Sequence, residues 1–472
     1  MRTTRRAGVA LICALTLLTG TMLGARADGD PPAVPKADCP DEPLRETGLQ
    51  GRAPAEDYPA RAAQGYQCNA EMVSRFNEVL MPGGSGGFRT YRYVDAAGNE
   101  CAFYDSVLLF PLNATTQKQN LLGVFVLDMS NPAAPRKTAN LQTPAMLSPH
   151  ESLSLNRHRG LLAAVNGNPT TGPGVIDIYD VKTNCLQPRL ISSTPFGIFG
   201  HEGEFSPDGN TFWVTSTAAA LITAVDISDP LLPRVLFTTR QYRPHGLNIS
   251  DDGNTLYLAD TTSGRGGLTI LDVSQVQARA AQPTATELSH LTWDTLSIPQ
   301  TNIPITVGGH PYLVEIDEYA RGLGAGNPAA PVGAGRIIDI ADPRSPSVVS
   351  DLRLEVHQRE NIAAIAEDPG ANFQLQGYAG HYCQVPQRED PGVVACSMIG
   401  SGLRLFDIRD PHAPAEIAYF NRPMASPPPG LRGGAFAMSQ PAFAPERGQI
   451  WYTDGNTGFY AVKIKDGVWP FE

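Results

Sequence analysis

Four of the nine histidines stand at one position of a repeated pattern in the chain. Each directly follows a glycine or proline and opens a strand-like run, as in Pro149-His150-Glu151, Gly200-His201-Glu202, Pro244-His245-Gly246 and Gly380-His381-Tyr382. Imidazole is the commonest transition-metal ligand in proteins, and several imidazoles around one point suit copper, iron or zinc. The pattern therefore predicts a site for one transition metal, with His150, His201, His245 and His381 as ligands.

Gln300 and Gln440 occupy the same position in two further copies of the pattern. Glu151 and Glu202, which follow two of the histidines, are candidates for carboxylates that orient the imidazole rings, or for solvated carboxylates at a rim. The alternative to a metal site is a ring of polar side chains that only hydrogen-bonds neighbouring elements. The sequence leaves both interpretations open.

Other polar residues are weaker candidates for chemistry. His158 and His310 fall in expected turns and are interpreted as surface residues. Four carboxylates near the ends of expected strands would suit calcium or acid–base chemistry, although capping of strand ends is the simpler explanation; they are Asp260, Asp317, Glu318 and Asp454. The absence of a Gly-x-Ser-x-Gly elbow, a Gly-rich phosphate loop and a His-Glu-x-x-His sequence disfavours hydrolases, kinases and zinc peptidases.

The histidines belong to a degenerate repeat in which a strand-like run ends in aspartate and is followed by two prolines. The clear copies have the form Asp-x-x-(Asn/Asp)-Pro-x-x-Pro and begin at Asp128, Asp226, Asp339 and Asp407. Weaker copies occur at Asp180 and Asp272, and a seventh, at residues 458–464, lacks the aspartate. The aspartate can hydrogen-bond the turn that follows, and neither proline can continue a strand ladder. Each copy is therefore expected to be a β-hairpin.

A second hairpin precedes each copy of the repeat. Pro207-Asp208-Gly209 and Asp251-Asp252-Gly253 are strong turn signals between strand-like runs. Two hairpins make a four-stranded sheet, and the 46-residue spacing of Asp180, Asp226 and Asp272 is typical of one propeller blade. The sequence predicts an all-β protein, a seven-bladed β-propeller of four-stranded antiparallel blades, in which the four histidines line the central channel.

The landmarks place the blades within residues 66–472, with inner strands that begin near residues 68, 149, 200, 244, 299, 380 and 439. The last blade lacks a fourth-strand signal. Residues 28–65 are therefore interpreted as an N-terminal tail, of which a segment within residues 40–62 is expected to close the ring. Residues 322–335 and 360–377 are interpreted as surface insertions, where binding loops are expected.

The unit of a strand followed by Asp-x-Ser-Asn-Pro-x-x-Pro, seen at Asp128, resembles the LVIVD repeat of bacterial and archaeal exported and cell-surface proteins. The resemblance covers most of the chain. It implies a β-propeller fold and an extracytoplasmic location, and it implies no reaction.

The first 27 residues differ from the rest of the chain. Arg2, Arg5 and Arg6 precede an apolar run, and a small-residue cleavage sequence ends at Ala27, so residues 1–27 are predicted to be a secretory signal peptide. No later segment supplies about 18 consecutive apolar residues, so no membrane span is expected. Loss of the four arginines in the leader would lower the formal charge from −11 to −15, which disfavours nucleic acid as a partner.

Six cysteines remain after the leader, an even number in an oxidising compartment, and disulfides are expected. The propeller arrangement predicts Cys68–Cys101 and Cys383–Cys396 as pairs on neighbouring inner strands. Cys39–Cys185 then follows by elimination.

Two functions from different classes are compatible with these residues. The first is an extracytoplasmic binding or scaffold module for a protein or glycan partner, which the repeat architecture favours. The second is a metal-dependent oxidoreductase with copper, iron or zinc held by His150, His201, His245 and His381 in the channel. A propeller hydrolase that uses carboxylates such as Asp260 and Glu318 has no spacing in its favour.

Overall fold

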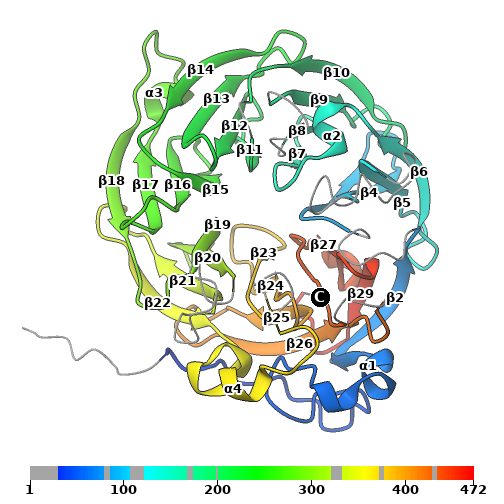
Figure 1. Ribbon diagram of the computed structural model, residues 1–472. Coiled ribbons are helices and arrows are strands. Elements are labelled where there is room, and N and C mark those ends of the chain that lie inside the picture. The colour runs from blue at the N-terminus through cyan, green and yellow to red at the C-terminus, as the bar shows by residue number, and fades with distance from the viewer. Residues whose placement is uncertain are drawn as a thin grey trace, which may run out of the picture.

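A computed structural model describes residues 30–78, 86–106, 122–166, 174–197, 200–319, 332–371, 377–427 and 433–471. Its strands form seven separate antiparallel sheets, arranged as a ring around a central axis (Figure 1). The chain is a seven-bladed β-propeller, as the repeat predicts. No helix among the described residues is long and apolar enough to cross a membrane.

In each of the first four blades the chain runs from the inner strand to the outer strand. Blade one contains β3 (Thr90–Val94), β4 (Glu100–Asp105), β5 (Val124–Asp128) and β6 (Arg136–Leu141). Blade two contains β7 (Ser154–Asn156), β8 (Leu161–Val165), β9 (Ile176–Asp180) and β10 (Arg189–Thr194). Blade three contains β11 (Gly203–Phe205), β12 (Thr211–Ser216), β13 (Leu221–Asp226) and β14 (Arg234–Thr239). Blade four contains β15 (Pro244–Ile249), β16 (Thr255–Asp260), β17 (Gly267–Asp272) and β18 (Thr286–Leu291).

The last three blades complete the ring and take two strands from the N-terminal region. Blade five contains β19 (Ile298–Val307), β20 (His310–Glu318), β21 (Gly335–Asp339) and β22 (Ser347–Leu352). Blade six contains β23 (Tyr382–Gln384), β24 (Val393–Ser397), β25 (Leu403–Asp407), β26 (Ala415–Asn421) and, outermost, β1 (Tyr66–Cys68). Blade seven contains β27 (Ala442–Ala444), β28 (Gln449–Asp454), β29 (Gly458–Ile464) and, outermost, β2 (Ala70–Phe76).

Helices in the described residues are short, and all except η1 and α1, which precede β1, lie between strands. The α-helices are α1 (Ala60–Gln64), α2 (Pro144–Leu147), α3 (Ser274–Gln277) and α4 (Ile362–Ile365). The 3-10 helices are η1 (Ala55–Asp57), η3 (Glu355–His357), η4 (Arg359–Asn361) and η6 (Pro445–Arg447).

The repeat aspartate ends the third strand of six blades and binds the turn that follows, as the sequence predicts. In blade three the Ser228 amide donates to Asp226 Oδ1 over 3.0 Å, and Arg234 Nε donates to Asp226 Oδ2 over 2.9 Å. Asp226 and Arg234 are also paired across β13 and β14. The aspartate therefore fixes where the outer hairpin turns and in which register its two strands pair.

The core lies between neighbouring blades, because the middle strands present buried side chains on both faces. One apolar cluster joins Phe103 of blade one to Leu162 and Tyr179 of blade two. Another joins Ile178 of blade two to Phe212 of blade three. Blades packed in this way hold their inner strands at fixed angles around the axis, which positions the channel side chains.

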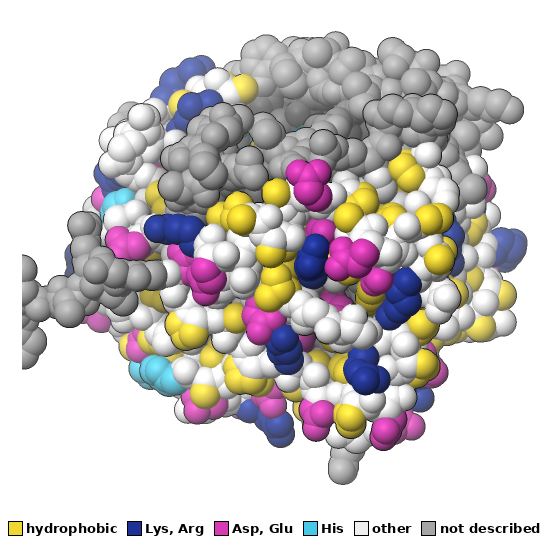
Figure 2. Space-filling view, turned by 60° about the horizontal axis from the view of Figure 1, so that its bottom comes forward, with side chains coloured by type: hydrophobic (Ala, Val, Ile, Leu, Met, Phe, Trp, Pro, Cys, Tyr) yellow, Lys and Arg dark blue, Asp and Glu magenta, His cyan; other side chains and the backbone are white. Residues whose placement is uncertain are grey.

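The N-terminal region runs along the outer side of blade six, at the bottom of the ring in Figure 1, where α4 lies to the left and α1 to the right. Buried Arg404 binds Glu46 and Glu416, and Arg52 forms an ion pair of 2.9 Å with buried Asp368. Seen from this side, basic and acidic side chains are interspersed on the surface (Figure 2). The segment before β1 is therefore packed onto the propeller.

Two expectations about the N-terminal region are wrong. The inner strand of blade one is β3, not a strand that begins near residue 68, because Tyr66–Cys68 pairs with the outer edge of β26. The ring is closed by β2, which pairs with β29, and not by a segment within residues 40–62. Both errors have the same cause. The N-terminal strands lack the aspartate and prolines of the repeat, so the sequence does not show which outer strand each of them pairs with.

The disulfides are Cys39–Cys68, Cys101–Cys185 and Cys383–Cys396. The predicted Cys383–Cys396 pair is confirmed, and the two cysteines lie opposite each other in the ladder of β23 and β24. The predicted Cys68–Cys101 and Cys39–Cys185 pairs are wrong. Cys68 lies on the outside of blade six beside the N-terminal segment, whereas Cys101 on β4 faces the turn after β9.

Some expectations fall on residues outside the described ranges. These are the signal peptide at residues 1–27 and most of the insertion at residues 322–335. Of the insertion at residues 360–377, the described part includes α4 and packs near the N-terminal segment, where Tyr378 donates to Asp368.

Candidate functional site

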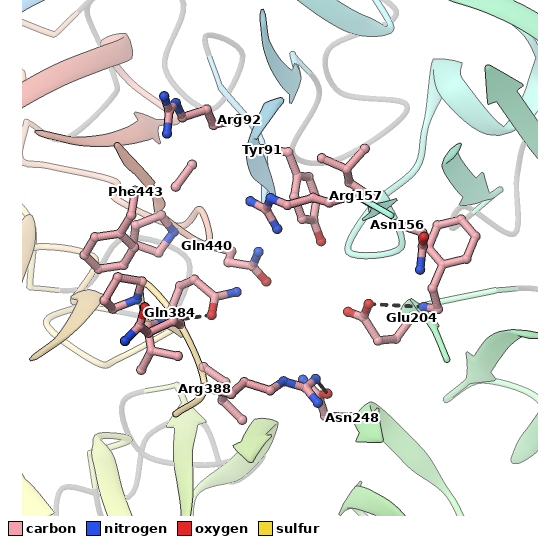
Figure 3. Close-up of a pocket in the computed structure, with 18 of the residues that line it drawn as sticks. Tyr91, Arg92, Asn156, Arg157, Glu204, Asn248, Gln384, Arg388, Gln440 and Phe443 are labelled. Carbon is pink, nitrogen blue, oxygen red and sulfur yellow. Dashed lines mark hydrogen bonds between the residues drawn. The ribbon is translucent and has the colours of Figure 1, made fainter. Parts of the chain in front are cut away.

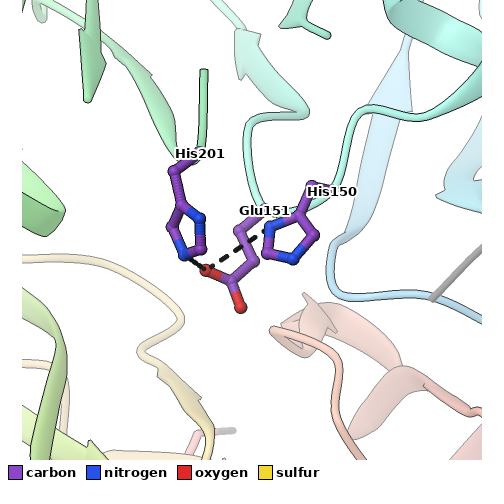
Figure 4. Close-up of side chains that lie close together, drawn as sticks. All are labelled: His150, Glu151 and His201. Atoms are coloured by element: carbon purple, nitrogen blue, oxygen red, sulfur yellow. Dashed lines mark ion pairs between the residues drawn. The ribbon is translucent and has the colours of Figure 1, made fainter. Parts of the chain in front are cut away.

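The four histidines meet at one end of the central channel. His150 and Glu151 precede β7, His201 precedes β11, His245 lies on β15, and His381 precedes β23. Their side chains point towards the axis, as the close-up of His150, Glu151 and His201 shows (Figure 4). The ring centroids of His150 and His201 are 4.5 Å apart, and those of His201 and His245 are 4.4 Å apart. The structure thus brings together the four positions that the repeat alignment singled out.

The carboxylate of Glu151 lies in the centre of this group. Its Oε2 is 3.0 Å from His201 Nε2 and 3.9 Å from both His150 Nδ1 and His245 Nε2. Its Oε1 is 3.4 Å from His381 Nε2. One carboxylate therefore faces an imidazole nitrogen from each of four blades.

Glu318 is the second carboxylate of the site, and the sequence interpretation assigned it no role there. It ends β20 of blade five, opposite Ile298 at the start of the inner strand. Its Oε1 is 3.4 Å from His245 Nε2, and its Oε2 is 3.3 Å from His381 Nε2. Blade five has Gln300 in place of histidine and supplies this carboxylate from its second strand instead. The glutamine at the histidine position of blade five is the feature of the sequence that could have pointed to Glu318.

These side chains are withdrawn from solvent. The exposed fraction of the side chain is 0% for His381, 3% for Glu151, and 6% for His245 and Glu318. It rises to 18% for His150 and 21% for His201, so the site meets solvent beside blades two and three. Among the described residues, five buried polar atoms of this group make no hydrogen bond of normal geometry; they are His150 Nδ1, His201 Nε2, His245 Nδ1, His381 Nε2 and Glu151 Oε2.

Neighbouring groups hold the rings in place. The Nδ1 of His381 lies 2.6 Å from the backbone oxygen of Met438, so Nδ1 carries the proton and Nε2 faces the carboxylates. Phe88 packs on His150 and His381, with ring centroids 4.7 and 5.3 Å away. His150 has a backbone φ of 52°, an uncommon conformation for a residue other than glycine. The fold thus maintains a strained backbone where the first histidine turns into the channel.

Burial and neighbouring charges give the histidines and carboxylates of the site different protonation states. Burial lowers the pKa of His245 to about 3 and that of His150 to about 4, so both imidazoles are neutral at pH 7. Burial also disfavours protonation of His381, but the carboxylates of Glu151 and Glu318 outweigh it and raise its pKa to about 9. Although burial alone raises the pKa of Glu151, the histidines beside it hold that pKa well below its usual range. Neutral imidazoles and an ionised carboxylate are the forms that bind metals, so His150, His245 and Glu151 are in that form, whereas His381 would have to release a proton to bind a metal.

A layer of buried, hydrogen-bonded side chains, here called the sealed layer, lies across the channel on one side of the histidines. Arg89 donates from Nη1 to Gln440 Oε1 over 2.5 Å, pairs through Nη2 with Glu202, and lies over the Tyr382 ring at 4.5 Å. Glu202 also accepts from the Leu247 amide over 2.6 Å and from the Tyr382 hydroxyl over 3.0 Å. All of these groups are buried. Glu202 and Gln440 thus serve the closure of the channel, whereas Gln300 is buried with no hydrogen-bond partner for its amide among the described residues.

The remaining candidates have structural roles. Asp260 accepts from Thr262 and Thr269, and Asp454 accepts from Phe436, Asn456 and Thr457, so both cap strand ends. Asp317 binds the Trp293 indole and Arg336. His158 is exposed, and His310, 44% exposed, pairs with Asp339 over 2.9 Å.

A separate cavity of about 490 Å³ lies at the other side of the sealed layer. The far ends of the inner strands line it, with Tyr91, Asn156, Glu204, Asn248, Gln384 and Phe443 among its walls (Figure 3). Arg388 reaches over its edge and donates to Asn248 Oδ1 over 2.7 Å. The channel therefore contains two distinct polar spaces, of which the first holds the histidines.

No family model and no curated protein matches the chain. Among solved structures, it is similar to hydrazine synthase of Kuenenia stuttgartiensis, with 12% identity, a TM-score of 0.50 and coverage of 83% of this chain and 98% of that one. It is also similar to the β-propeller domain of Cps50 (Swd1) of Myceliophteria thermophila, with 12% identity, a TM-score of 0.47 and coverage of 80% and 97%. A third structure is the periplasmic gluconolactonase of Pseudomonas aeruginosa, with 14% identity, a TM-score of 0.46 and coverage of 73% and 92%. At such low identity, these likenesses concern the propeller fold alone.

Proposed function

We propose that the chain is a metal-dependent oxidoreductase whose transition metal lies on the propeller axis. The ligands would come from His150, His201, His245 and His381, with the carboxylate of Glu151. The observation that carries the proposal is the position of Glu151, whose two oxygens face imidazole nitrogens from four blades at 3.0 to 3.9 Å.

The candidate ligand atoms support a metal because several of them are buried and make no hydrogen bond of normal geometry. Buried polar groups are normally hydrogen-bonded, and burial without a partner costs free energy. A cation between the imidazoles and Glu151 would satisfy His150 Nδ1, His201 Nε2 and Glu151 Oε2 together. His150, His201 and Glu151 form a group of two histidines and one carboxylate, the combination typical of non-haem iron sites, and imidazoles also suit copper and zinc.

A redox-active metal at this place would supply electron transfer to or from a bound substrate. The chain's own residues orient and shield it. The bond between His381 and the Met438 oxygen keeps Nε2 directed at the carboxylates, and Phe88 covers two of the rings. The Arg89 and Glu202 pair closes the floor, so that substrate would approach from the side of His150 and His201.

An extracytoplasmic location fits this proposal. Three disulfides join the chain, and structural disulfides form and persist in oxidising compartments. The sequence resemblance to exported LVIVD repeat proteins supports the same location.

Metal analysis tests the function directly. We expect protein purified from the culture medium without chelators to contain iron, copper or zinc by mass spectrometry, and the variant with His201→Ala and His245→Ala together to have lost it. His158→Ala, which changes an exposed histidine, is the control and should keep the metal. A wild-type protein that stays metal-free after reconstitution with each of the three metals would refute the proposal.

A second proposal, a binding module for a protein or glycan partner, is supported by the separate cavity of about 490 Å³. Its aromatic and amide side chains, such as Tyr91, Asn156 and Asn248, suit the apolar faces and hydroxyls of a sugar. Binding of labelled oligosaccharides that is lost in the Asn248→Ala variant, with metal content unchanged, would separate this function from the first. Failure of a broad oligosaccharide panel would leave the cavity without support as a glycan site.

A further inference from the structure

The ligand atoms at the channel end divide into two groups of three. In each group the ligand atoms lie within 4.8 Å of one another. The first group is His150, Glu151 and His201, and the second is Glu151, Glu318 and His381. Glu151 is the residue common to both, so the groups are adjacent and share one carboxylate.

The two oxygens of Glu151 face different groups. Oε2 is turned to His201 at 3.0 Å and His150 at 3.9 Å, whereas Oε1 is turned to His381 at 3.4 Å. A carboxylate in this orientation can bind one cation with each oxygen. It is therefore placed as a bridge.

His245 lies between the groups and contacts both carboxylates. Its Nε2 is 3.9 Å from Glu151 Oε2 and 3.4 Å from Glu318 Oε1. Glu318 then reaches His381 through its other oxygen at 3.3 Å. Four imidazoles and two carboxylates thus form one continuous set of neighbouring ligand groups in the channel.

We propose that the channel holds two metal ions bridged by Glu151, one bound by His150 and His201 and the other by His381 and Glu318. His245 is placed to complete either coordination sphere. This inference rests on the proposed function, since it assumes that the site binds metal. It adds the number of metal ions and the role of Glu318.

The arrangement of the ligand atoms favours two ions over one. Glu151 and Glu318 both lie within 3.4 Å of the same nitrogen, His381 Nε2, and both side chains are at most 6% exposed. A single cation between His150 and His201 would face only Oε2 of Glu151. The ligand atoms of Glu151, Glu318 and His381 form a second group within 4.8 Å of one another, and this group can hold a second ion.

A two-metal centre would also define the substrate class. Metal ions about 3.5–4 Å apart typically bind two oxygens of one substrate or an oxygen between them. The open side of the site, beside His150 and His201, is lined by imidazoles and not by apolar groups alone. We therefore expect a small oxygen-containing substrate, such as dioxygen, a peroxide or an oxyanion.

The number of metal ions per chain tests this inference. The full-length secreted protein is loaded anaerobically with Fe(II) or, separately, with Co(II), desalted, and analysed for metal and protein. We expect about two ions per chain for the wild type and about one for Glu318→Gln, which keeps the size of the side chain and removes its charge. Glu446→Gln changes a half-exposed surface carboxylate and should keep two.

His150→Ala provides a second variant, because it removes a ligand of the other ion and should also leave about one ion per chain. Circular dichroism and the melting temperature of each apo variant show whether it is folded. With Co(II), the wild type should show the weakened electron paramagnetic resonance signal of coupled ions, and Glu318→Gln should show the signal of an isolated ion.

Each result decides between the two proposals. One ion per wild-type chain, unchanged in Glu318→Gln, would overturn the two-metal inference and leave the proposed function intact. Two ions per chain in both the wild type and Glu318→Gln would overturn the assignment of Glu318. No metal in any sample would overturn the proposed function, and the two-metal inference with it.

Discussion

In blade one, Arg89 occupies the position that is histidine or glutamine in other blades. It pairs with Gln440 in a parallel bridge. Its guanidinium contacts groups of four other blades, namely the Glu151 backbone oxygen, Glu202, Tyr382 and Gln440. Next to it, Gly246 leaves room for the Glu202 carboxylate, because a Cβ there would lie 2.2 Å from Glu202 Oε2. At the scale of single residues, one buried ion pair separates the histidine site from the cavity beyond it.

Replacement of Arg89 by methionine should lower the free energy of unfolding by about 3–5 kcal/mol, since it leaves the Glu202 carboxylate buried without its cation. Urea unfolding at pH 7 measures this. The double variant Arg89→Met with Glu202→Gln should recover most of the loss, because the glutamine carries no charge, its oxygen can accept from the Leu247 amide, and its nitrogen can donate to the Tyr382 hydroxyl oxygen. A loss below about 1 kcal/mol for Arg89→Met, the size typical of an exposed pair, would show that the pair is solvated.

At the scale of elements, the repeat aspartate controls the outer hairpin of six blades. Burial alone would raise the pKa of Asp226, but hydrogen bonds from Ser228 and Arg234 outweigh it and lower that pKa. The pKa values of the corresponding residues are also lowered, at Asp128, Asp180, Asp272, Asp339 and Asp407. The same local charge interaction therefore recurs around the ring.

These aspartates predict a loss of stability in acid. Because their folded pKa lies below the unfolded value of about 3.9, the ionised form contributes stability at neutral pH, and this is lost as pH falls below about 4. We expect the Asp226→Asn variant to be less stable than the wild type at pH 7. The difference between the two urea midpoints should be smaller at pH 3, because the stability that the ionised Asp226 contributes decreases once the pH lies below the pKa of the unfolded chain. An equal difference at both pH values would mean that Asp226 acts only through neutral hydrogen bonds.

At the scale of the whole molecule, the ring is closed by strands that are close in sequence to the N-terminus and far from their partners. β2 covers the edge of β29, and β1 covers the edge of β26. Cys39–Cys68 then ties the preceding segment to β1. Closure in this way completes blade seven and covers the edge of β29, which an open ring would present to other chains.

Two truncations test this closure. A chain that begins at residue 66 keeps β1 and β2 and should remain a folded monomer, less stable than the full chain. A chain that begins at residue 79 lacks β2, exposes the edge of β29, and should aggregate or dimerise. Size-exclusion chromatography and circular dichroism distinguish these outcomes. A monomeric, folded product from residue 79 would show that β2 is dispensable for closure.

The sequence by itself determined the blade architecture and the meeting of the four histidines. Both depend on a local pattern repeated at a nearly constant period, in which the turn after Asp226 has the same chemistry as the turn after Asp128 or Asp407. Equivalent positions in such a ring must face one axis, so His150, His201, His245 and His381 could be assigned together. The Cys383–Cys396 pair was also predictable, because both cysteines lie within one blade.

Only the tertiary structure decided the contacts between distant segments. Glu318 joins the histidines from the second strand of its blade, Arg89 reaches Glu202 across the channel, and Cys101 meets Cys185 of the next blade. The pairing of β2 with β29 is likewise a contact between segments that are far apart in the sequence. None of these follows from spacing along the chain, because each depends on the distances between blades, which are set when the blades pack and the ring closes.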